Sequence, residues 1–117
     1  MTMRSLITTH VLDTSRGRPA VGVHVSLDFH EEKASWTALA DGVTNADGRI
    51  SDFLPENTKL ATGVYRLTFD TASYFQGSGV EGFYPSIVIM FQIRDPAAHY
   101  HVPVLLSPYG YSTYRGS

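Results

Sequence analysis

The sequence predicts an all-β domain, a sandwich or barrel of about eight short strands. Three observations favour this fold class: apolar and polar residues alternate with a period of two, the alternating stretches are rich in β-branched and aromatic residues, and turn-forming residues separate them at regular intervals. The 117 residues are 43% hydrophobic and 12% aromatic, a composition typical of a globular chain. We therefore expect residues 1–117 to form a single domain.

The first expected strand covers residues 6–12, and parity places His10 on the same face as Leu6 and Leu12. The second, residues 21–30, is expected to be half-buried, with one apolar face made of Val21, Val23, Val25, Leu27 and Phe29.

Further strands are expected in order at residues 36–43, near residue 49, and at 64–70, 86–94, 99–106 and 109–114. Residues rich in Gly, Pro, Asn, Asp and Ser mark the turns at 13–19, 41–42, 45–48 and 107–110. Only residues 71–77 are expected to form a helix, and a short one.

Residues 99–106 break the ordinary pattern of a half-exposed strand. One face is core-like, made of Tyr100, Val102, Val104 and Leu106, whereas the other combines imidazoles with apolar groups, namely His99, His101, Pro103 and Leu105. Such a second face is typical of an interface or a cleft rather than of a surface in bulk water.

Composition excludes several classes of function. The chain has no cysteine, so it has neither disulfides nor thiolate metal sites. A formal charge of −2 argues against nucleic acid as the main partner. Residues 1–10 lack the pattern of a signal peptide, and no apolar run is long enough to cross a membrane, so a cytoplasmic location without membrane contact is expected. Nucleotide-binding Gly loops, Gly-x-Ser-x-Gly and His-Glu-x-x-His are absent.

The candidate site consists of imidazoles and one guanidinium. Imidazole takes and gives protons near neutral pH, which makes His10 and His101 candidate acid–base groups. Arg49 follows a tight turn and could recognise a carboxylate or an oxyanion, or could simply be solvated. A zinc site made of His99, His101 and His10 is a weaker alternative, because that spacing is unspecific. His24 and His30 are expected on an exposed face.

Four segments in order resemble the 5-hydroxyisourate hydrolases, a transthyretin-related family. These segments are His-Val-Leu-Asp at 10–13 with Gly-Arg-Pro-Ala at 17–20, Thr-Asn-Ala-Asp-Gly-Arg at 44–49, His-Tyr-His-Val-Pro at 99–103 with Leu-Leu-Ser-Pro at 105–108, and Tyr-Arg-Gly-Ser at 114–117. The resemblance implies a transthyretin-like sandwich of two four-stranded sheets with one short helix, assembled as a homotetramer, a dimer of dimers with the site in the channel between the dimers.

The resemblance also implies a reaction in urate degradation, part of purine catabolism. The ring of 5-hydroxyisourate is hydrolysed to 2-oxo-4-hydroxy-4-carboxy-5-ureidoimidazoline, with no metal or organic cofactor. The family's catalytic positions fall on His10, Arg49, His101 and Ser117. Substrate-binding positions fall on His10, Arg49, Tyr114 and Arg115, and Arg115 is also expected to anchor the tail.

On this hypothesis, His10 and His101 share the work of a general base, and Arg49 stabilises the oxyanion that grows at the attacked carbonyl. The hydroxyl groups of Tyr114 and Ser117 orient substrate or water. The main alternative is a non-catalytic carrier of small ligands, because transthyretin has this fold. Transthyretin, however, has Lys, Glu and Thr at the positions of His10, Arg49 and His101, and it lacks the Tyr-Arg-Gly-Ser ending.

Overall fold

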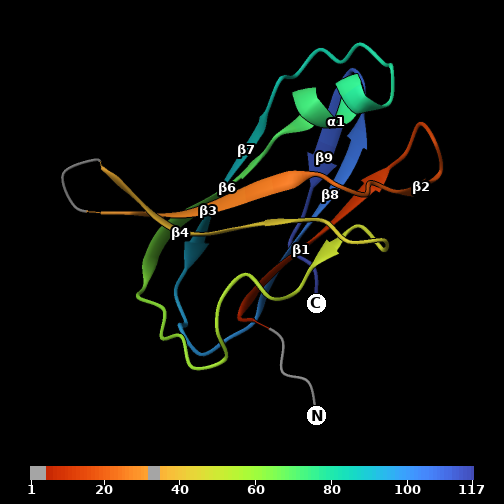
Figure 1. Ribbon diagram of the computed structural model, residues 1–117. Coiled ribbons are helices and arrows are strands. Elements are labelled where there is room, and N and C mark those ends of the chain that lie inside the picture. Colours follow the sequence, from red (N-terminus) through yellow and green to blue (C-terminus); the bar gives the residue numbers. More distant parts are fainter. Residues whose placement is uncertain (1–4, 32–34) are drawn as a thin grey trace.

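The chain folds into two β-sheets and one short helix, as the computed structural model shows for residues 5–31 and 35–117 (Figure 1). The elements in order are β1 (Ile7–Asp13), β2 (Arg18–Pro19), β3 (His24–His30), β4 (Trp36–Val43), β5 (Arg49–Ile50), β6 (Gly63–Phe69), α1 (Thr71–Gly77), β7 (Ile87–Ile93), β8 (Tyr100–Ser107) and β9 (Gly110–Thr113). Apolar residues from both sheets form one shared core. The predicted sandwich with one short helix is therefore confirmed.

One sheet has the strand order β2-β1-β8-β9, with β5 also paired to β1, and the other has the order β4-β3-β6-β7. The pair of β1 and β8 is parallel, and the other pairs are antiparallel. The first sheet has five strands instead of the expected four because Arg18–Pro19, predicted as part of a turn, runs back along Leu12 and Asp13. Proline is tolerated there since β2 is an edge strand.

The predicted alternation holds through the core. Val25 and Leu27 on β3, and Leu67 and Phe69 on β6, are at most 1% exposed. The expectation for Val21 was wrong, because this side chain is 53% exposed and precedes the strand. Gly22, at a φ of +84°, lies in a turn between Val21 and the start of β3, so parity cannot be extended across it.

Helix α1 forms at the predicted residues and is tied to the end of β1. Its N-cap is Asp70, whose side chain accepts a hydrogen bond from the Ser73 backbone N–H. The Tyr74 hydroxyl donates to Oδ2 of the buried Asp13 at 2.7 Å. Burial raises the pKa of Asp13, but hydrogen bonds from Ser15, Tyr74 and the Arg16 backbone outweigh it and lower that pKa overall. Within the described ranges, no helix is long and apolar enough to span a membrane.

Candidate active site

Three of the predicted site residues lie on one face of the β1–β5–β8 sheet. His10 on β1 pairs directly with Arg49 on β5 and with Pro103 on β8. His101 lies two residues from Pro103 along β8, opposite Thr8. Because side chains directly opposite each other share a face and alternate along a strand, His10, Arg49, His101 and Thr8 all project from the same side of the sheet. Their neighbours Ile7, Thr9 and Val11 project to the other side and are buried in the core.

A tight turn places Arg49. The Asn45 side chain accepts hydrogen bonds from the backbone N–H groups of Asp47 and Arg49, at 2.9 and 3.0 Å. Gly48 has a φ of +75°, and its carbonyl accepts from the Val11 N–H at 2.7 Å, which docks the turn on β1. A Cβ at Gly48 would lie 2.4 Å from the Val11 carbonyl oxygen. Glycine is therefore required to bring Arg49 beside His10.

The surroundings of His10 favour the neutral imidazole. Burial lowers the pKa of His10, and the positive charge of Arg49 lowers it further. A hydrogen bond with the Asp47 backbone and the Asp47 charge act in the opposite direction but do not cancel these effects. A neutral imidazole can accept a proton. Because its pKa is lowered, His10 keeps this capacity at a more acidic pH than an ordinary histidine does.

His101 is held by a hydroxyl group on the neighbouring strand. Thr8 Oγ1 lies 2.7 Å from Nδ1 of His101 and 3.1 Å from Nε2 of His99. The two imidazole rings are nearly parallel, with centroids 6.3 Å apart and an interplanar angle of 13°. His101 is half-buried, whereas Thr8 is only 3% exposed. The ring of His101 therefore has a fixed partner at Nδ1.

The C-terminal tail runs back over His101. The Gly116 N–H donates to the His101 carbonyl at 2.8 Å, and the two residues form an isolated β-bridge. A Cβ at Gly116 would lie 2.5 Å from Cδ2 of His101 and 3.1 Å from Cγ of Pro103. Tail backbone thus packs directly on the imidazole, and Ser117 follows as an exposed residue.

The other tail residues point in different directions. The guanidinium of Arg115 lies over the ring of Tyr100, 4.5 Å from its centroid, and donates to the His99 carbonyl at 3.4 Å. These contacts attach the tail to β8 and to the residue before it. They agree with the expectation that Arg115 anchors the tail. Tyr114 is 58% exposed and lines, together with His101 and Arg115, a hollow of about 170 Å³.

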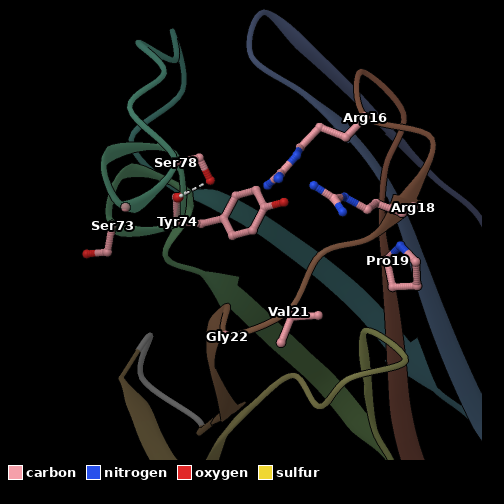
Figure 2. A pocket seen from close by; sticks show the side chains of 9 residues that line it. Arg16, Arg18, Pro19, Val21, Gly22, Ser73, Tyr74 and Ser78 are labelled. Atoms are coloured by element: carbon pink, nitrogen blue, oxygen red, sulfur yellow. Dashed lines mark hydrogen bonds between the residues drawn. The ribbon is translucent and has the colours of Figure 1, made fainter.

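A separate hollow with a volume of about 460 Å³ lies between the loop after β1 and helix α1. Figure 2 shows Arg16 from the loop and Arg18 from β2 reaching toward the ring of Tyr74. No histidine lines this hollow, and the Tyr74 hydroxyl is engaged by Asp13. The hollow offers no imidazole that could accept a proton from water, and it contains none of the predicted site residues.

The described residues do not form the zinc site that was considered as an alternative. Among residues 5–31 and 35–117, no group of three or more His, Asp or Glu side chains is arranged to hold a metal ion. The Thr8 hydroxyl contacts a ring nitrogen of both His99 and His101, and His10 sits beside the positively charged Arg49. A cationic neighbour disfavours a metal cation.

The sequence pattern of the HIUase/Transthyretin family matches residues 7–116. The chain belongs to this family. A 5-hydroxyisourate hydrolase of Halalkalibacterium halodurans is 47% identical over 119 residues, covering 98% of this chain and 100% of the relative. The fold class and the family expected from the sequence are thus confirmed.

Solved structures of this family include both enzymes and transthyretins. The 5-hydroxyisourate hydrolase of Klebsiella pneumoniae superposes with a TM-score of 0.81 at 44% identity, covering 95% of this chain and 98% of that one. Sea bream transthyretin in complex with thyroxine has a TM-score of 0.88 at 32% identity, covering 96% of this chain and 95% of that one. Backbone similarity alone therefore does not separate the two functions, because the transthyretin superposes at least as well as the enzyme.

Sequence reasoning missed two residues that contact the candidate catalytic groups. Thr8 contacts His101, and this contact depends on the parallel pairing of β1 with β8. Gly116 was part of the terminal motif, but its packing on the imidazole depends on the path of the tail. A polar residue two positions before His10 was the only signal for Thr8.

Proposed function

We propose that this chain is a 5-hydroxyisourate hydrolase that opens the six-membered ring of its substrate to give 2-oxo-4-hydroxy-4-carboxy-5-ureidoimidazoline in urate degradation. The observation that carries the proposal is the shared face of His10, Arg49 and His101, three residues from three strands. The names of relatives 44–47% identical to this chain support the same activity.

The mechanism uses the imidazoles to activate water. A neutral imidazole of His101 or His10 accepts a proton from water as the oxygen attacks an amide-like carbonyl carbon, a role that contributes about 10²- to 10⁴-fold in rate. A carbon–oxygen bond forms, and negative charge grows on the carbonyl oxygen. In this proposal Arg49 stabilises that oxyanion. The ring carbon–nitrogen bond then breaks, and the imidazolium returns its proton to the leaving nitrogen.

The tail completes the site in this proposal. Tyr114 and Ser117 orient substrate or water with their hydroxyl groups, and Arg115 binds substrate or, through Tyr100 and the His99 carbonyl, holds the tail. No metal or organic cofactor takes part. The location is cytoplasmic, and residues 1–117 work as one domain.

We also propose that the chain assembles as a homotetramer, a dimer of dimers whose central channel contains the site. Strands β7 and β9 are the last strands of their sheets, and both carry exposed apolar residues: Val88 is 48%, Met90 61% and Tyr111 42% exposed. Exposed apolar edge strands favour pairing with another copy of the chain. Light scattering after size-exclusion chromatography tests this proposal, and a monomer at micromolar concentration would contradict it.

Turnover tests the proposed activity. 5-Hydroxyisourate generated freshly from urate decays spontaneously, and its absorbance is followed with and without the protein. We expect a large acceleration, and we expect His101→Asn to lower kcat by about 10²-fold or more while the assembly stays intact. His30→Asn is the matched control, because His30 lies in the other sheet, where its ring contacts Trp36 at an interplanar angle of 45°. No acceleration over the spontaneous decay would refute the proposed function and favour the carrier alternative.

A further inference from the structure

We propose that Thr8 is a positioning residue that sets the protonation pattern of His101 and connects it to His99. The inference rests on the proposed function and deepens it. It begins from the two short contacts of a single hydroxyl group, 2.7 Å to Nδ1 of His101 and 3.1 Å to Nε2 of His99.

The Thr8 hydroxyl has only one proton to donate. With both histidines neutral, it donates to one imidazole nitrogen and accepts from the other, so the tautomers of His99 and His101 are coupled. In one arrangement, Nδ1 of His101 donates to Thr8, Thr8 donates to His99, and Nε2 of His101 keeps its lone pair. In the opposite arrangement, Nε2 of His101 carries the proton. Only the first arrangement makes Nε2 of His101 a general base.

The burial of Thr8 strengthens this coupling. The residue is 3% exposed, so water cannot readily replace either imidazole as a partner, and an unmade hydrogen bond there would be costly. Register holds the geometry as well, because Thr8 and His101 are directly paired across the parallel strands. The neighbouring Thr9 points to the core, where its hydroxyl donates to the Val102 carbonyl at 2.6 Å.

The hydrogen-bonded series His101–Thr8–His99 also allows positive charge to move away from His101. When Nε2 of His101 takes a proton from water, the ring becomes an imidazolium. The Nδ1 proton can then pass to Thr8 Oγ1 as the Thr8 hydroxyl proton passes to Nε2 of His99. The positive charge moves to His99, whose carbonyl is contacted by Arg115, and His101 is left neutral with a proton at Nε2. Reversal of both transfers restores the imidazolium at His101, which then gives its Nε2 proton to the leaving nitrogen. His10 and Arg49 also project from this face, and the Asp47 charge acts on His10.

Three variants test the inference. Thr8→Val removes the hydroxyl and keeps the shape, Thr8→Ser restores the hydroxyl, and Thr9→Val removes the neighbouring hydroxyl that faces the core. For Thr8→Val we expect kcat to fall about tenfold or more. The loss should not exceed the ~10²- to 10⁴-fold that a general base contributes, and KM should change less than about twofold. Thr8→Ser should recover most of the wild-type kcat. Thr9→Val should lower the Tm and leave kcat near wild type.

A second readout does not depend on activity. Nitrogen-15 NMR of the imidazoles, assigned with His101→Asn, distinguishes a protonated Nδ1 from a protonated Nε2. We expect wild type and Thr8→Ser to hold His101 mainly with the proton on Nδ1, and Thr8→Val to lose that preference. Unchanged His101 shifts in Thr8→Val, or a kcat equal to wild type, would overturn the inference. Wild-type protein that shows the tautomer effect without hydrolysing 5-hydroxyisourate would instead overturn only the proposed function.

Discussion

Replacing Gly116 with alanine tests whether the tail fixes the His101 ring. The added Cβ would lie 2.5 Å from Cδ2 of His101, whereas carbon atoms in contact are about 3.5–4.0 Å apart. The ring or the tail must therefore move by about 1 Å or more. A misplacement of that size at a reacting group can lower the rate about 10²-fold. We expect kcat for 5-hydroxyisourate to fall by that order, while loss of the hydrogen bond from Gly116 to His101 lowers the free energy of unfolding by only about 0.5–1.5 kcal/mol.

Gly110→Ala provides the matched control. This glycine is also near the C-terminus, but a Cβ there would meet only the Ser107 hydroxyl oxygen, at an ordinary 3.7 Å. We expect its kcat to match that of wild type. Equal kcat values for Gly116→Ala and Gly110→Ala, with both variants folded and assembled, would show that contact between the tail and the imidazole does not position His101.

Two further predictions concern charge and stability. Burial and the Arg49 charge lower the pKa of His10, so Arg49→Gln should raise that pKa and move the acid limb of the kcat/KM profile to higher pH. An NMR titration in which the His10 pKa stays the same or falls would contradict this prediction. Tyr74→Phe removes the hydroxyl that donates to the Asp13 carboxylate. Urea denaturation should show that the free energy of unfolding falls by about 1.5–3 kcal/mol, with kcat unchanged. A decrease under about 0.5 kcal/mol would refute the stabilising role of this hydrogen bond.

Much of the fold could be predicted from periodicity. Helix α1 and strand β4 have the predicted bounds, and the core-like face of β8 is buried. Val21 departs from the alternation because the pattern assumes an unbroken strand, and the turn at Gly22 interrupts it. Strand β2 was missed since two residues are too few to show a period.

The candidate site was only partly predictable for a different reason. Parity places His10 and His101 each on one face of its own strand, but nothing in either strand gives the register between β1 and β8. Thr8 and His101 are 93 positions apart in the chain and meet only through that parallel pairing. The contact of Gly116 with the imidazole depends in the same way on the tail crossing back over β8. Such long-range contacts are not encoded in local patterns.

A crystal structure of the assembled protein with a non-hydrolysable analogue of the 5-hydroxyisourate ring would locate the substrate site. We expect the analogue to bind on the outer face of β1 and β8, with polar atoms within hydrogen-bond distance of His10, Arg49 and His101. An analogue bound in the hollow between Arg16, Arg18 and Tyr74, with the histidines empty, would contradict this expectation.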